Sequence, residues 1–144
     1  MSIHISIIWA KIASIVTIVT GVICALASHP ATESAWMFLF DILKWPLDGD
    51  PGAFHADTRA VNAVLGGTMV GWGLLMYFLM TEQLHAKVPG LPRMMLIALC
   101  AWFVVDCTGS LFAGLPGNVV LNIGFMVMFV PPLVALMKTD FFCI

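Results

Sequence analysis

The sequence predicts an all-α integral membrane protein: a four-helix bundle with a short interfacial helix in its first outer loop. Hydrophobic residues make up 61% of the 144 residues and charged residues 10%, so too little polar surface is present to cover a water-soluble core. Four apolar stretches each reach about 20 residues, the length that a helix needs to cross a ~30 Å hydrocarbon core. A membrane β-barrel would instead show short segments of alternating hydrophobicity.

The whole chain, residues 1–144, is expected to form one transmembrane domain, with spans at residues 3–27, 60–80, 94–115 and 118–137. The first stretch shares features with a secretory signal, because Lys11 precedes an apolar run that ends in the small-residue sequence ALA. Its opening segment MSIHISIIWA is apolar rather than basic, so we expect a retained helix. Residues 33–45 predict a helix that Thr32 can cap and Pro46 ends. This helix is too short to span and should lie in the membrane interface.

The basic residues predict the orientation. Lys11, Lys87, Arg93 and Lys138 would lie on the side of the two termini, whereas only Lys44 and Arg59 would lie on the opposite side. Loops that stay in the cytoplasm carry the excess of Lys and Arg. We therefore expect both termini in the cytoplasm and the acidic loop at residues 28–59 outside.

Asp106 is the strongest chemical signal, because it lies inside the third expected span. A charged Asp at the centre of a lone helix costs about 2.5–3.5 kcal/mol, so it should face the bundle interior. Thr68 is expected at a similar depth, near the midplane, and the residues nearer the outer mouth that can join the same polar layer are Asn62, Ser110, Asn122 and Arg59. Arg59 is the nearest cation but would need a water or the Asn62 amide to reach Asp106. Two interpretations stay open: a proton or cation site, or a neutral Asp that fixes helix register.

Glycines punctuate the second span and indicate close helix packing. Gly67 and Gly71 form a GxxxG pair, and Gly66 and Gly73 run along the adjacent stripe. The third span carries Gly109 on the face of Asp106. We expect the second and third spans to dock these small-residue faces on each other. Alternatively, one glycine stripe contacts another protein or a pigment-like ligand.

Catalytic and cofactor signals are weak. The residues on the outer side that could gather round a metal ion are His29, Asp48, Asp50, His55 and Asp57. They show no recognised ligand spacing, so we expect no metal site. All four histidines lie at or beyond helix ends, which argues against haem or chlorin, and no cofactor is expected. No nucleotide-binding loop or nucleophile motif is present, so we expect no enzyme. A net charge of −2 without a basic patch argues against a nucleic-acid partner.

Several segments resemble an uncharacterised family of small four-span inner-membrane proteins of Gram-negative bacteria. These segments are FDILKWPLDGDPG, TRAVNAVLGGTMVGWG, WFVVDCTGS and PGNVVLNIGF, and they cover most of the chain from about residue 36 onward. The resemblance implies a bacterial inner-membrane location and no activity. The positions that it marks are Asp41, Trp45, Pro46, Asp48, Gly49, Arg59, Gly66, Gly67, Gly71, Trp72, Asp106 and Asn122.

Two functional hypotheses follow. The first is a non-catalytic accessory or scaffold subunit of a larger respiratory or photosynthetic membrane complex, whose partners are the lipid bilayer and other integral membrane subunits. The second is a small oligomeric transporter or proton-linked carrier in which Asp106 titrates. No inverted repeat between the two halves supports the carrier, and four spans would have to oligomerise to build a path.

Overall fold

The computed structural model describes residues 1–44, 48–50, 52–88 and 90–140. The regular secondary structure in this part of the chain is α-helical. Trp45 and Pro46, including the expected helix stop at Pro46, lie outside the described residues. The helices are α1 (Ile3–Leu26), α2 (Ser34–Lys44), α3 (Ala56–Leu79), α4 (Glu82–Lys87), α5 (Leu91–Phe112) and α6 (Pro116–Asp140). Four of them, α1, α3, α5 and α6, are long and apolar enough to cross a membrane, which confirms the predicted fold class.

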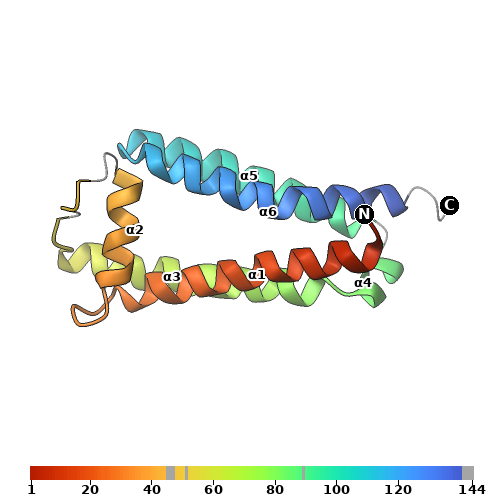
Figure 1. The fold of residues 1–144 in the computed structure, drawn as a ribbon, viewed down its shortest axis with the longest axis horizontal. Helices are drawn as coiled ribbons and strands as arrows, with labels where there is room; N and C mark the ends of the chain where they lie inside the picture. Colours follow the sequence, from red (N-terminus) through yellow and green to blue (C-terminus); the bar gives the residue numbers. More distant parts are fainter. Residues whose placement is uncertain (45–47, 51, 89, 141–144) are drawn as a thin grey trace.

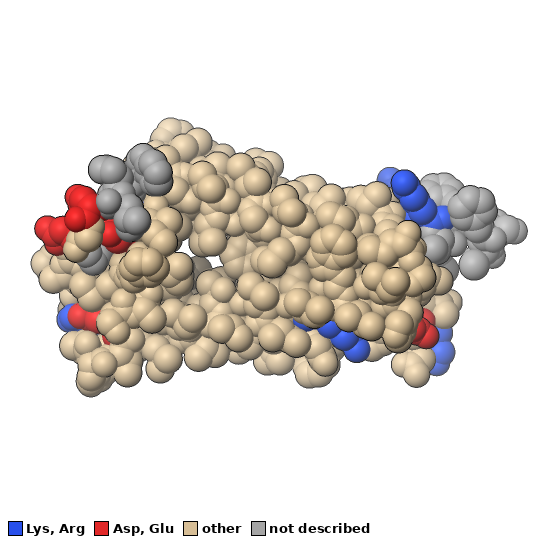
Figure 2. Space-filling view, viewed as in Figure 1, with Lys and Arg blue, Asp and Glu red and all other residues tan. Residues whose placement is uncertain are grey.

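The four long helices form two layers (Figure 1). α1 and α3 lie side by side in one layer, α5 and α6 form the other, and α1 also packs against α6. α2 crosses one end of the bundle between the layers, while α4, the N-terminus and the C-terminal end of α6 lie at the opposite end. Most of the acidic side chains visible in Figure 2 gather at the α2 end. The chain therefore crosses the bundle four times and returns to the end where it began.

The prediction that the second and third spans dock their small-residue faces is wrong. α3 packs its glycine-bearing face on α1, because α1 presents a matching small-residue surface there. A Cβ atom added to Gly73 would lie 2.7 Å from Ile18 Cγ1 and 3.1 Å from the Ser14 carbonyl oxygen. α3 reaches α5 through larger side chains, since the rings of Trp72 and Trp102 pack with their centroids 5.3 Å apart and their planes tilted by 36°. Aromatic rings thus fill the wider gap between α3 and α5.

α1 is rich in small and hydroxyl side chains, and its hydroxyls bond to its own backbone. Ser14 Oγ donates to the Ala10 carbonyl oxygen at 2.8 Å, and Thr17 Oγ1 donates to the Ala13 carbonyl oxygen at 3.0 Å. Both side chains are fully buried. Because each donor is satisfied within α1, the helix can place these polar groups inside the bundle without a partner on another helix.

The main apolar core occupies the half of the bundle nearer the termini. It is built from side chains of all four long helices, and its fully buried centre is Ala10, Leu99, Phe129, Leu133 and Leu136. A second, smaller cluster lies near α2, where Cys24 of α1 and Ala27, just after α1, pack with Trp36 and Phe54. The α2 end is thus held together separately from the main core.

The bounds of α5 are shifted by three residues at both ends relative to the predicted span, and α6 ends three residues later than predicted. Two further differences concern α3 and α4. α3 begins at Ala56, four residues before the expected start, because the polar segment before residue 60 already forms its first turn. α4 falls in the expected inner loop, where Thr81 accepts a hydrogen bond from the Leu84 backbone N–H and caps a short turn of helix. Neither difference changes the number of spans.

Candidate functional site

A polar cluster joins α5 to α6 around the carboxylate of Asp106. The Asn118 amide donates to Asp106 Oδ2 at 3.0 Å, and the Asn122 amide donates to the same oxygen at 2.5 Å. Asn118 also donates to Ser110 Oγ at 2.7 Å. Asn122 is 2% exposed and Ser110 is 7% exposed, so these bonds form largely out of contact with the surroundings. We call Asp106, Ser110, Asn118 and Asn122 the carboxylate cluster.

The local sequence explains why these side chains meet. Asp106 and Ser110 are four residues apart on α5, and Asn118 and Asn122 are four residues apart on α6, so each pair lies on one helix face. Gly114, at φ +73°, ends α5 in the left-handed conformation. The Leu115 N–H then donates to the Ser110 carbonyl oxygen at 2.8 Å, which closes a Schellman turn. Pro116 opens α6 directly afterwards, so the two faces are brought together in an antiparallel hairpin.

The cluster lies nearer the α2 end than the sequence predicted. Asp106 is six residues before Phe112, the last residue of α5, which places it about 9 Å from that helix end. The sequence prediction put it near the midplane because it extended the span to residue 115, whereas Gly114 ends the helix earlier. The carboxylate therefore lies between the middle of α5, about 7 Å away, and the end of α5 on the α2 side.

The structure does not bring the other members of the expected polar layer to Asp106. Thr68 is exposed and donates to the Val64 carbonyl oxygen in its own helix. Asn62 is buried against α1, where its backbone carbonyl accepts a hydrogen bond from Cys24 Sγ at 3.4 Å. Its side-chain Nδ2 has no hydrogen-bond partner among the described residues. Of the expected layer, Asn122 bonds to the carboxylate directly, and Ser110 is linked to it through the Asn118 amide.

Arg59 is bound to Glu33, the residue before α2. Arg59 Nε and Nη2 donate to the two Glu33 carboxylate oxygens at 3.0 and 3.2 Å, a two-pronged pairing. The two side chains are 27% and 13% exposed, so solvent screens the pair less than it screens an ordinary surface ion pair. The pair holds the start of α2 against the first turn of α3. Because Arg59 is bound to Glu33, it does not form an ion pair with Asp106.

We expect the charge reversal Arg59→Glu to loosen the attachment of α2 to α3. Two carboxylates would then face each other, and a charge-assisted bond of about 1.5–3 kcal/mol would be lost. Backbone amides of α2 should exchange with solvent deuterium faster in this variant. The exchanged pair Arg59→Glu with Glu33→Arg should restore part of the protection. Equal exchange in the single and double variants would show that the ion pair does not hold α2.

The expected packing glycines fall into two groups. Gly66 and Gly73 lie against α1, where an added Cβ would collide with α1 atoms. Gly67, Gly71 and Gly109 are exposed, and an added Cβ at each would meet nothing within 4 Å among the described residues. The GxxxG pair Gly67 and Gly71 thus faces away from the chain's own helices.

The outer loop forms short turns of its own rather than a cage for a metal ion. Asp48 Oδ1 accepts from the Asp50 N–H at 2.9 Å, and Asp50 Oδ1 accepts from the Gly52 N–H at 3.3 Å. Asp41 is 3% exposed and accepts from the Gly49 N–H at 3.0 Å. Within the described ranges, no group of three or more His, Cys, Asp or Glu side chains could hold a metal ion. These carboxylates shape the connection between α2 and α3.

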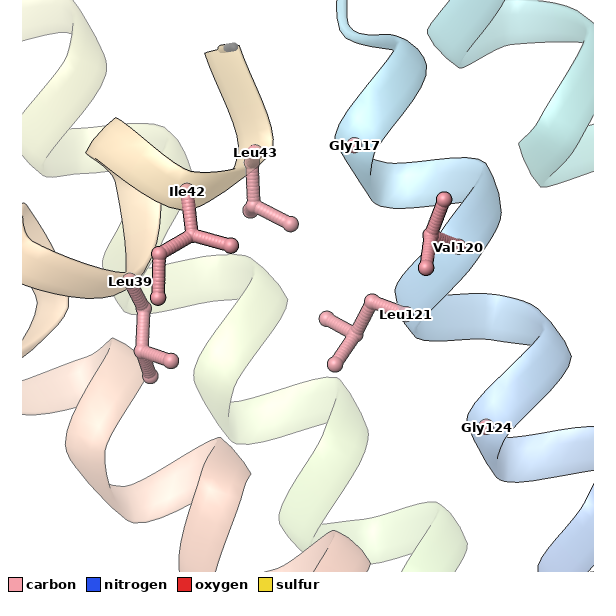
Figure 3. A pocket seen from close by; sticks show the side chains of 7 residues that line it. All are labelled: Leu39, Ile42, Leu43, Gly117, Val120, Leu121 and Gly124. Carbon is pink, nitrogen blue, oxygen red and sulfur yellow. The ribbon is translucent and has the colours of Figure 1, made fainter. Parts of the chain in front are cut away.

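An apolar pocket of about 340 Å³ lies between α2 and the N-terminal part of α6 (Figure 3). Its lining residues are Leu39, Ile42, Leu43, Gly117, Val120, Leu121 and Gly124. Sequence reasoning did not find this pocket, because it depends on the angle at which α2 crosses the bundle. Asn118 was also missed, although its spacing of four residues from Asn122 is the pattern that pairs them with Asp106 and Ser110.

No known protein family, curated protein or solved structure matches this chain. The resemblance to small four-span proteins of Gram-negative bacteria stays a prediction. Functional inference therefore depends on the contacts of the chain's own residues.

Proposed function

We propose that this protein is a non-catalytic accessory or scaffold subunit of a larger bacterial inner-membrane complex of the respiratory or photosynthetic kind. The observation that carries the proposal is the two-sided glycine pattern of α3. One face, with Gly66 and Gly73, packs on α1, whereas the other face, with Gly67 and Gly71, meets nothing within 4 Å in the described chain. A second helix could approach that outer face as closely as α1 approaches the inner face.

The outer face of α3 continues as one exposed apolar stripe. Val64, Leu75 and Phe78 are 72%, 56% and 63% exposed, and they flank the two glycines at spacings of three and four residues. Glycine inside a helix is about 1 kcal/mol less favourable than alanine, and contact with lipid alone does not offset this difference. A helix of a partner subunit would gain close backbone contact there. We call Val64, Gly67, Gly71, Leu75 and Phe78 the outer stripe.

The competing proposal, a proton-linked carrier that uses Asp106, has less support. The donors to Asp106 are the neutral amides of Asn118 and Asn122 in the adjoining helix. Hydrogen bonds of this kind hold α5 and α6 together. Arg59, the cation expected nearby, is bound to Glu33. A structural role for the carboxylate cluster explains these contacts without a transported ion.

The charge distribution supports an orientation with both termini in the cytoplasm. Four of the basic residues belong to helix segments in the half of the bundle that holds α4: Lys11, Lys87, Arg93 and Lys138. Most of the acidic side chains visible in Figure 2 lie at the α2 end. By the positive-inside rule, this distribution favours an α2 end on the outer side of the proposed inner membrane.

Purification of the tagged chain from its native membranes in mild detergent tests the proposal. We expect a stoichiometric integral membrane partner, identified by mass spectrometry, to accompany the unaltered chain and to be reduced by about tenfold in Gly71→Leu, a loss equivalent to about 1.4 kcal/mol. Gly109→Leu is the matched control, because it makes the same change at an exposed glycine of α5. Recovery of a homo-oligomer alone would favour the carrier. A partner retained equally by all three chains would exclude the outer stripe as its contact.

A further inference from the structure

The pocket between α2 and α6 narrows toward the end of the bundle. At Gly117 the two helices touch, because an added Cβ would collide with the Ile42 carbonyl oxygen and lie 2.7 Å from Leu43 Cα. At Gly124, two turns further along the same face of α6, an added Cβ would meet nothing within 4 Å. α2 therefore diverges from α6 as α6 enters the bundle. We call the resulting space the wedge; its seven lining side chains are shown in Figure 3.

The wedge is suited to hydrocarbon rather than to water. All of its lining residues are apolar or glycine, whereas a buried water needs two to four polar partners. It extends over about 10 Å of α6, between Gly117 and Gly124, within a helix that is apolar enough to span a membrane. Figure 2 shows an opening in the surface beside α2, where the two layers separate. An open apolar space at this depth is in contact with lipid.

An unfilled wedge would cost the surrounding side chains their dispersion contacts, since protein interiors are packed almost without voids. A volume of about 340 Å³ is at the small end of the range for ligand pockets. The lining residues follow about 10 Å of α6, a length along which an acyl chain can lie. Lys44 follows Leu43 directly and is exposed, which puts a cation at the level where a phosphate headgroup would lie.

We propose that the wedge holds one acyl chain of a phospholipid from the leaflet on the α2 side, with the headgroup phosphate near Lys44. The bound chain completes the packing between α2 and α6 that no side chain supplies. Gly124 is the residue that keeps the space open, because any larger side chain there would enter the wedge. This site is independent of the outer stripe, which lies on α3.

Native mass spectrometry tests the proposal on protein taken from vesicles of phosphatidylethanolamine and phosphatidylglycerol into mild detergent. We expect one phospholipid to stay with each unaltered chain. In Gly124→Leu the retained fraction should fall about tenfold, because the leucine side chain fills the wedge. Gly109→Leu is the control and should retain the lipid, since it adds the same side chain to an exposed glycine outside the wedge.

Both glycines have open space at Cβ, so both variants should fold, and their helix content is checked by circular dichroism. A phosphatidylethanolamine with a photoreactive acyl chain locates the contact in the unaltered protein, with adducts expected on Leu39 and Leu121. Equal lipid retention in Gly124→Leu and Gly109→Leu would overturn the proposal. Adducts no more frequent at Leu39 than at Val64 on the outer stripe would also overturn it, as would a retained mass that is not a phospholipid.

Discussion

Gly66→Ala should separate α1 from α3 and lower the free energy of unfolding by about 3 kcal/mol, the upper part of the usual range for overpacking. The added methyl group would press on the backbone N of Ala25 and lie 2.5 Å from the Gly21 carbonyl oxygen. Backbone atoms inside a helix cannot turn aside as a flexible side chain can. The whole of α3 would have to move, and its contact along α1 would loosen. Equilibrium unfolding in mixed micelles measures the effect.

Gly67→Ala is the matched control, because it makes the same change at the adjacent position of the same helix. Its new methyl group meets nothing within 4 Å, and alanine is about 1 kcal/mol better than glycine in a helix. This variant should be as stable as the unaltered protein or more stable. Similar losses in the two variants would show that α3 does not pack on α1 through the Gly66 face.

Asp106→Ala should be the next most damaging change, because it removes the carboxylate acceptor of the buried Asn122 amide and one of the two acceptors of the Asn118 amide. Each unsatisfied buried polar group costs about 1–3 kcal/mol. Hydrogen bonds between membrane helices average about 0.6 kcal/mol, but a carboxylate acceptor strengthens them. We therefore expect a loss of about 2 kcal/mol and a looser contact between α5 and α6. Asp106→Asn keeps the shape and one acceptor oxygen, so it should cost less.

A double-mutant cycle with Asn122→Ala separates the bond from other effects of the substitutions. Asn122 is buried and donates to Asp106, so the two losses should overlap by about 1 kcal/mol rather than add. The corresponding cycle between Asp106 and Thr68 is the control, since Thr68 bonds to its own helix. Strictly additive losses in the Asn122 cycle would show that the carboxylate cluster does not hold the hairpin.

Helix positions were predictable from the sequence because apolar length alone decides them. α1 begins at the expected residue and α2 lies within one residue of its expected bounds. The pairing of the helices was not predictable in the same way, since α3 carries glycines on two faces and each face suits a close neighbour. The choice is made by α1, whose Ser14, Gly21 and Ala25 form the surface into which Gly66 and Gly73 fit. In the sequence, these small residues are equally typical of a secretory signal, so they did not identify α1 as the helix that packs on α3.

The candidate site was predictable where partners lie on adjacent helices joined by a tight turn. Asp106, Ser110 and Asn122 meet because Gly114 and Pro116 fix the hairpin between them. Arg59 was assigned to the wrong carboxylate because its distance to Glu33 depends on how the chain turns before α2. Contacts set by the path of an irregular loop are not encoded in helical periodicity.

The hydroxyls of α1 that bond to its own carbonyls have a consequence for synthesis in the membrane. Ser14 and Thr17 have their acceptors within the same helix, so α1 has no unsatisfied hydroxyl donor there. It can therefore enter the lipid by itself, before α3 has been inserted. α5 cannot do so at equal cost, because Asp106 has its amide donors only once α6 has followed. The last two spans should therefore enter the bilayer together.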